Sequence, residues 1–166
     1  MENELKVVDI FIGTTLRGSA KGSGRAMYIM RTKRKNGSDY EAAPQIVEYD
    51  NTTESESVLR AIRDALQRLH YACTVVIHTE CSYVASAITQ HWPEKWQRNG
   101  WKSAKGNPVK NAVLWEMLLQ DVEDGGHILL AEGEKHEYAE WMRFNMPLKR
   151  ALKDIFTEVP KNWQHE

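Results

Sequence analysis

The residue that could do chemistry most directly is Glu80, which follows a short apolar run, Val75-Val76-Ile77. That run predicts a buried strand, and the segment from Ala85 to Gln90 after it predicts a helix. A carboxylate between a buried strand and a helix is well placed to hold a metal ion or a polar ligand, because both element ends are rigid and the site faces solvent. Glu80 is therefore the first candidate site residue.

A second group of residues combines tryptophan with positive charge directly after that helix. Its members are Trp92, Lys95, Trp96, Arg98, Trp101, Lys102, Lys105, Lys110 and Trp115. A basic, aromatic segment indicates a polyanionic ligand, because lysine and arginine bind phosphates independently of base sequence and in a salt-sensitive way. The alternative role is packing. We expect Trp92, Trp101 and Trp115 to pack this segment onto a helix over residues 59–69, whereas both roles stay open for Trp96.

Other candidate residues show no pattern that predicts a site. The glycines from Gly18 to Gly24 lie between two strands of a predicted hairpin and not before a helix, which argues against a nucleotide loop. Cys81 has no evident histidine base, and with Cys73 it forms neither a disulfide framework nor a zinc cluster. Four histidines lack metal-ligand spacing and are interpreted as surface or hydrogen-bonded residues: His78, His91, His127 and His136.

Length and composition indicate a single domain. The chain has 166 residues, a formal net charge of −1 and an isoelectric point of about 6.6. Because the overall charge says nothing about polyanions, the case for such a ligand rests on local charge. Met1-Glu2-Asn3-Glu4 lacks the pattern of a signal peptide, and no apolar run approaches the length of a membrane span. We therefore expect no membrane association and a cytoplasmic location.

The elements that must position these residues follow from hydrophobic periodicity. Strands are predicted over residues 7–12, 26–32, 40–49 with a kink at Pro44, 72–78 and 127–131. Helices are predicted over 54–69, 83–90, 111–122 and 137–156, the last one broken or kinked by Pro147. This order predicts an α/β fold with a mixed five-stranded sheet, in which three antiparallel strands are followed by parallel ones and helices cover both faces.

The sequence around Glu80 resembles the type 1 ribonuclease H (RNase H) family. Thr79-Glu80-Cys81-Ser82-Tyr83-Val84 stands where the family has Thr-Asp-Ser-x-Tyr-Val. Three later segments resemble the family's basic protrusion and the helix after it: Gly100-Trp101-Lys102-Ser103-Ala104, Pro108-Val109-Lys110-Asn111 and Leu114-Trp115. The resemblance implies the same fold over about residues 6–144. It also implies two magnesium ions, held by an Asp, Glu, Asp, Asp set, that cleave the RNA strand of an RNA/DNA hybrid.

Most of those carboxylates are missing from this chain. The resemblance aligns the four family positions with Gly13, Val58, Glu80 and Ala139, so that one carboxylate of four is retained. We therefore expect a catalytically inactive member, a pseudoenzyme, with no metal and no cofactor. The alternative is an active, magnesium-dependent hydrolase with a shifted acidic cluster, which would join Glu80 to Glu134, Glu137 or Glu140 and to Glu54 or Glu56.

The resemblance also implies a nucleic-acid-binding surface for an RNA/DNA hybrid or duplex. Its residues would be Ser19, Thr53, Lys95, Trp96, Arg98, Lys102, Lys105 and Lys110. The predicted organisation is an RNase H-like domain over residues 5–145, with the protrusion at 91–111, followed by a helical extension and tail over 146–166. The extension has an apolar side, formed by Leu148, Leu152, Ile155 and Phe156, which predicts either a protein-docking segment or an intramolecular lid.

Overall fold

The structure is a computed structural model that describes residues 4–146. Its strands are β1 (Lys6–Thr14), β2 (Gly22–Lys33), β3 (Asp39–Glu41), β4 (Gln45–Thr52), β5 (Cys73–Thr79) and β6 (Ile128–Gly133). Its helices are α1 (Glu54–Leu66), α2 (Ser82–Thr89), α3 (Trp92–Arg98), α4 (Ala112–Gly125) and α5 (Ala139–Asn145). Each predicted strand and helix has a counterpart, and α3 is an additional short helix inside the predicted protrusion.

The strands form one mixed sheet in the order β3-β2-β1-β5-β6, with β4 also paired to β2. β2 is antiparallel to β1, β3 and β4, whereas β1, β5 and β6 are parallel to one another. The predicted mixed sheet is confirmed, with one difference. The third predicted strand is divided into β3 and β4 around Pro44, because proline has no N–H to donate to a strand ladder.

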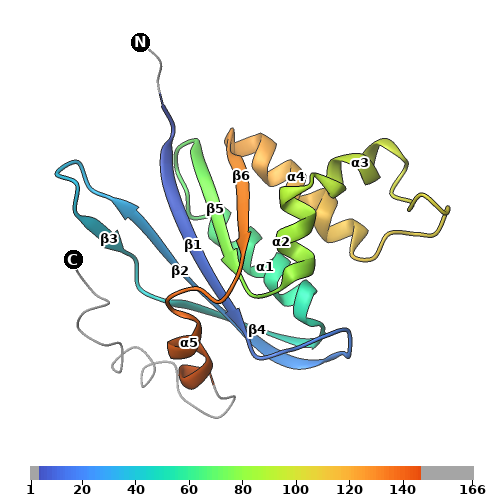
Figure 1. Cartoon of the computed structure of the whole chain (residues 1–166), viewed down its shortest axis with the longest axis horizontal. Helices are drawn as coiled ribbons and strands as arrows, with labels where there is room; N and C mark the ends of the chain where they lie inside the picture. Colours follow the sequence, from blue (N-terminus) through green and yellow to red (C-terminus); the bar gives the residue numbers. More distant parts are fainter. Residues whose placement is uncertain (1–3, 147–166) are drawn as a thin grey trace.

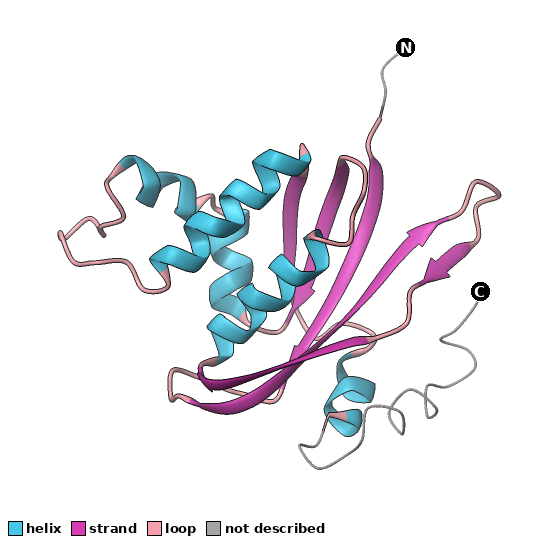
Figure 2. Ribbon diagram, turned by 180° about the vertical axis from the view of Figure 1, so that it is seen from behind, coloured by secondary structure: helices cyan, strands magenta, loops and turns pink. Residues whose placement is uncertain are grey.

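α1 and α2 cover one face of the sheet, and α4 packs against α1 on the same side (Figure 2). α1 begins with a capping box, in which Thr53 Oγ1 accepts the N–H of Glu56 and the Glu56 carboxylate accepts the N–H of Thr53. Ile10, Ile12 and Ile77 point to this face and are fully buried in the main core. This packing fixes the ends of β1 and β5 relative to the start of α1.

The opposite face carries α5 over one end of the strands (Figure 1). Met142 of α5 and Met146, which follows the helix, pack with Phe11, Met27 and Ile29 in a second apolar cluster. Tight apolar packing of this kind holds α5 directly against β1 and β2.

The helix predicted over 137–156 begins at Ala139 in the structure. The part of this predicted helix after Met146 lies outside the described residues, as does nearly all of the predicted C-terminal extension. Within residues 4–146, no helix combines the length and the apolar character needed to cross a membrane.

Candidate functional site

Glu80 lies between the end of β5 and the start of α2. Its carboxylate Oε1 accepts a hydrogen bond from Arg143 Nη2 of α5 at 3.0 Å. Both side chains are partly exposed, so solvent screens the ion pair. The one carboxylate that matches the family pattern is thus neutralised by an arginine of the same chain.

Gly13, near the end of β1, lies directly beneath α5. A Cβ atom at this position would lie 2.9 Å from Met142 Sδ, 3.2 Å from Met142 Cβ and 3.3 Å from Met146 Cε. Nonbonded carbon atoms ordinarily lie about 3.5–4.0 Å apart, so alanine would be crowded here, and a larger side chain such as aspartate would displace the Met142 and Met146 side chains. Two methionine side chains therefore fill the space that the resemblance assigns to a metal-binding carboxylate.

The other two family positions are buried and apolar. Val58 of α1 is fully buried, and Ala139, the first residue of α5, is almost fully buried. Beside Val58, Ser57 Oγ lies 2.8 Å from Thr14 Oγ1, and this hydrogen bond joins α1 to the end of β1. Placing a cation against the apolar side chains of Val58 and Ala139 would be costly. Residues 4–146 contain no group of three or more His, Cys, Asp or Glu side chains that could hold a metal ion.

The acidic residues of the shifted-cluster hypothesis are dispersed. Four of them have partners of their own: Glu54 accepts the N–H of Gly18 at 2.8 Å, Glu56 caps α1, Glu137 pairs with Arg31 at 2.8 Å, and Glu140 pairs with Lys135. The Lys135 ammonium also lowers the pKa of the Glu140 carboxyl. Each of these four carboxylates binds a different partner, so the described residues do not form the acidic cluster.

A small pocket of about 230 Å³ lies between the β1–β2 loop and the starts of α1 and α2. It is lined by Gly18, Ser19, Glu54, Ser55, Cys81, Tyr83 and Lys110. Two predicted ligand contacts, Ser19 and Lys110, therefore come together here, but next to the Glu54 carboxylate. Burial raises the pKa of the Cys81 thiol, so this cysteine lacks the thiolate character of a nucleophile.

Thr53, another predicted nucleic-acid contact, is 2% exposed. Its hydroxyl accepts the N–H of Glu56 at 3.2 Å and lies 3.4 Å from Ser55 Oγ. A buried capping hydroxyl is available to a ligand only if the cap opens. The structure thus gives Thr53 a role in starting α1.

The predicted protrusion at 91–111 contains α3 and a loop that returns to α4 (Figure 1). The loop is held by its backbone: Trp101 N–H donates to Trp96 O at 2.7 Å, and Val109 N–H donates to Trp101 O at 3.0 Å. Its cationic side chains are left exposed, and none of them forms an ion pair with another described residue: Lys95, Arg98, Lys102, Lys105 and Lys110. The structure thus supplies a positively charged surface on a defined support.

Tryptophan side chains form the base of the protrusion. Trp115 is 1% exposed and donates its Nε1–H to Tyr83 Oη at 3.1 Å. The ring of Trp96 lies 6.1 Å from the rings of both Trp92 and Trp115, measured between centroids, and Trp101 also packs against the main core. The packing role predicted for Trp92, Trp101 and Trp115 is confirmed in the main core, which also contains the buried side of α1, whereas the neighbours of α3 itself are α2 and α4. Trp96 belongs to the same cluster and is partly exposed.

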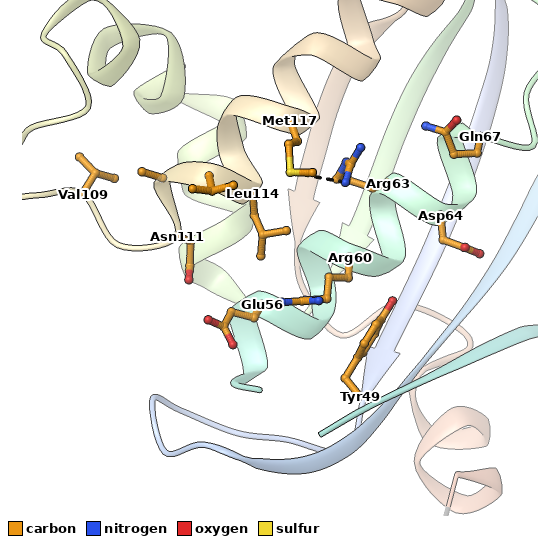
Figure 3. A pocket seen from close by; sticks show the side chains of 12 residues that line it. Tyr49, Glu56, Arg60, Arg63, Asp64, Gln67, Val109, Asn111, Leu114 and Met117 are labelled. Atoms are coloured by element: carbon orange, nitrogen blue, oxygen red, sulfur yellow. Dashed lines mark hydrogen bonds between the residues drawn. The ribbon is translucent and has the colours of Figure 1, made fainter. Parts of the chain in front are cut away.

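A groove of about 790 Å³ runs between β4, α1 and α4 (Figure 3). Charges of both signs line it, with Glu56 and Asp64 against Arg60 and Arg63. Arg63 forms a two-pronged ion pair with Asp121, at 2.6 Å from Nε and 3.2 Å from Nη2. Because the charges balance and one arginine is already paired, this groove adds little to a surface for polyanions.

Two histidines have contacts that the sequence analysis did not assign. His136 is buried with its Nε2 at 2.9 Å from Ile12 O, and burial lowers its pKa. His78 lies between two carboxylates, with Nε2 at 2.8 Å from Asp9 and Nδ1 at 3.4 Å from Glu132. The interpretation of both as hydrogen-bonded histidines is confirmed. Their partners carried no local signal, because His136 and Ile12 are 124 residues apart in the chain.

Solved RNase H structures share this arrangement of strands and helices. A type 1 RNase H with the type 2 active-site motif has a TM-score of 0.68 and 19% identity, over 88% of this chain and 72% of that one. The foamy viral protease-reverse transcriptase in complex with an RNA/DNA hybrid has a TM-score of 0.63 and 15% identity, over 93% of this chain and 20% of that one. These likenesses define the class: the protein has an RNase H fold.

Sequence comparison then identifies the family. The RNase H family profile matches residues 9–130. A ribonuclease H of Thermoanaerobacter sp. (strain X514) is 31% identical over 121 residues, covering 72% of this chain and 73% of that relative. A ribonuclease H of Caldicellulosiruptor saccharolyticus is 41% identical over 71 residues, covering 43% of this chain and about half, 49%, of that relative. The chain belongs to the RNase H family, as the residues around Glu80 suggested.

Proposed function

We propose that this chain binds nucleic acid, as an RNA/DNA hybrid or duplex, through its basic protrusion and does not hydrolyse it. The observation that carries the proposal is the crowding at Gly13, where a Cβ atom would lie 2.9 Å from Met142 Sδ. A carboxylate there would have to displace the Met142 and Met146 side chains, so the space that the first ligand of a two-metal centre needs is filled in this arrangement.

Magnesium does not fit the side chains at the four family positions. The ion requires near-octahedral coordination by oxygen, and Gly13, Val58 and Ala139 supply no side-chain oxygen. Glu80 supplies two, but Arg143 is paired with one of them, and a guanidinium repels a neighbouring cation. For these reasons we do not extend the hydrolytic activity of the family to this chain.

The exposed cations of the protrusion suit a phosphate backbone. Lysine and arginine neutralise phosphates without regard to base sequence, and the release of counterions makes such binding weaken as salt rises. Glu54 lies beside Ser19 and Lys110 in the small pocket and repels a phosphate there, so we expect the backbone to follow the outer surface of the protrusion. The hybrid bound to the foamy viral protein is the appropriate first probe.

Binding and cleavage should be measured in the same samples of a labelled RNA/DNA hybrid with magnesium or manganese present. Fluorescence anisotropy measures binding, and the length of the labelled RNA strand afterwards measures cleavage. We expect affinity to fall with salt while the RNA stays intact. The double variant Lys102→Ala/Lys105→Ala should lower affinity and reduce the slope of log affinity against log salt by about 2, roughly one per lost phosphate contact. A matched control is Lys6→Ala/Lys35→Ala, which removes two exposed lysines outside the protrusion and should leave the slope unchanged.

Two results would contradict this proposal. Metal-dependent cleavage that Glu80→Gln abolishes would establish an active nuclease with displaced ligands. Equal loss of affinity in the two double variants would show that the protrusion is not the binding surface.

A further inference from the structure

Four apolar side chains lie on the face of the sheet opposite α1 and away from α5: Val7, Val76, Ile128 and Leu130. Strand register places them in two adjacent rows, and side-chain alternation puts them on the same face as Phe11, which packs under α5. Val7, Ile128 and Leu130 are 49%, 51% and 46% exposed. In Figure 1, no described helix crosses this end of β1, β5 and β6. We call these four residues the open strip.

An uncovered apolar strip is unusual on these strands. β1, β5 and β6 are parallel, and parallel strands in α/β proteins ordinarily have both faces covered. Their other face is covered by α1 and α2. Adjacent exposed apolar side chains mark an interaction surface, so the open strip calls for a cover that residues 4–146 do not supply.

The chain that follows α5 begins on this same face. Met146, the last described residue, packs in the cluster with Phe11, and its Cε is 3.3 Å from the Cβ position of Gly13. From Gly13 to Val7, β1 extends about 20 Å at roughly 3.3 Å per residue. A helix of about 13 residues spans that distance at 1.5 Å per residue, and residues 147–166 exceed this length.

The sequence after Met146 has the pattern such a cover requires. Leu148, Leu152, Ile155 and Phe156 follow the spacing i, i+4, i+7, i+8, which gathers apolar side chains on one side of a helix. No glycine or proline interrupts residues 148–159. An exposed apolar strip and a segment with one apolar helix side are therefore joined in one chain.

Charge also favours contact between the open strip and the segment after Met146. The open strip is bordered by the carboxylates of Asp9 and Glu132, which both contact His78 and remain partly exposed. Before Asp154, the charged residues of the following segment are all basic: Lys149, Arg150 and Lys153. Opposite charges therefore meet when the segment lies along the strip.

We propose that residues 148–156 lie on the open strip of their own chain and thereby hold α5 over Gly13. Covalent connection gives this segment a high effective concentration at the strip, an advantage that a second copy or a foreign protein lacks. The contact goes beyond nucleic-acid binding, because the strip and the protrusion's supporting helices lie on opposite faces of the sheet. The two proposals can therefore fail separately.

Thiol labelling of the full chain tests the contact. Leu130→Cys places a thiol on the strip, and Val113→Cys on α4, where the native side chain is 69% exposed, provides an exposed reference. Labelled positions are identified by peptide mass, because the two native cysteines are buried but present. Each thiol is then combined with Phe156→Asp or with the matched control Thr157→Asp, which adds the same charge on the other side of the helical pattern.

We expect the thiol at position 130 to react roughly tenfold more slowly than the one at 113, as for a segment docked most of the time. Thr157→Asp should preserve this difference, and Phe156→Asp should remove most of it. Leu152→Asp is a second disrupting variant, and circular dichroism verifies that each variant folds. Hybrid affinity should stay unchanged throughout.

Three outcomes would overturn the inference. Equal rates at positions 130 and 113 in the otherwise native chain would mean that the strip is bare. Slow labelling at 130 that accelerates on dilution would assign the strip to a second copy. Slow labelling that persists in both folded Asp variants, at 152 and 156, would show that this segment is not the cover.

Discussion

Any side chain at position 13, near the end of β1, would occupy the space that the Met142 side chain fills. Because Gly13 has no Cβ, the Met142 sulfur lies close to the strand backbone, and Phe11 and Met27 complete the apolar surroundings. An aspartate at Gly13 would introduce both a steric clash and an unpaired charge. The packing of α5 and the loss of a metal ligand are therefore two aspects of one contact.

Gly13→Ala is expected to lower the free energy of unfolding by about 1–3 kcal/mol through overpacking, and Gly13→Asp should lower it further because a charge is buried. Met142→Ala should relieve the Gly13→Ala cost, with a coupling of at least about 0.5 kcal/mol in a double-mutant cycle measured by urea unfolding. Additive effects of the two substitutions would show that Met142 is not the obstacle.

His136 should make the folded state sensitive to acid. Burial lowers its pKa from the ordinary 6.5, so below that value the unfolded chain binds the proton more readily. The stability due to neutral His136 is present above pH 6.5 and is lost as pH falls from 6.5 through the folded-state pKa. The slope contributed by this one group cannot exceed about 1.4 kcal/mol per pH unit.

Urea unfolding on both sides of pH 6.5 measures this effect. His136→Gln should remove the slope, and His91→Gln, at an exposed histidine, should keep it. An unchanged slope in His136→Gln would assign the acid sensitivity to other groups.

The N-terminus of α1 shows how one element can have a structural role where the resemblance implies a binding role. Thr53 caps the helix, and Glu54 reaches across to the backbone of Gly18. Both contacts stabilise the junction between α1 and the β1–β2 loop. The groups to which the resemblance assigns a phosphate contact at this junction are therefore engaged in contacts within the chain.

Thr53→Ala is expected to lower the free energy of unfolding by about 1 kcal/mol through loss of the cap, with no change in hybrid affinity under conditions where the variant is fully folded. Thr53→Ser retains a capping hydroxyl and should preserve stability. The measurements are urea unfolding and anisotropy on the same preparations. A lower hybrid affinity of folded Thr53→Ala would show that Thr53 contributes to nucleic-acid binding.

At the scale of the whole molecule, a net charge of −1 conceals an uneven distribution. Five exposed cations lie close together on the protrusion, although others are exposed elsewhere, and the acidic side chains near the end of the sheet are held in ion pairs and caps. The molecule therefore has a positively charged protrusion, while its described residues contain no group of three or more His, Cys, Asp or Glu side chains that could hold a metal ion.

Magnesium should not stabilise the folded protein beyond its effect on ionic strength. A ligand that binds only the folded state adds RT ln(1 + [L]/Kd), about 2.7 kcal/mol at a hundredfold excess over Kd. Thermal unfolding in magnesium chloride and in sodium chloride of equal ionic strength should therefore agree, for the native chain and for Glu80→Gln alike. A magnesium-specific rise in Tm that Glu80→Gln removes would reveal a surviving site.

The sequence by itself determined the strands and the helices other than α3, the family pattern around Glu80 and the absence of carboxylates at Gly13, Val58 and Ala139. These properties are local, because periodicity, caps and motifs are carried by neighbouring residues. The division of the third strand also had a local cause in Pro44, although its pairing as two strands required the register of β2.

Only the tertiary structure decided what fills the space at those positions. The contacts between Met142 and Gly13 and between Arg143 and Glu80 join residues far apart in the chain, and they depend on how α5 settles on the sheet. The exposure of Leu130 likewise depends on which elements cover the opposite face of β6. Long-range packing creates these features, and no local pattern encodes them.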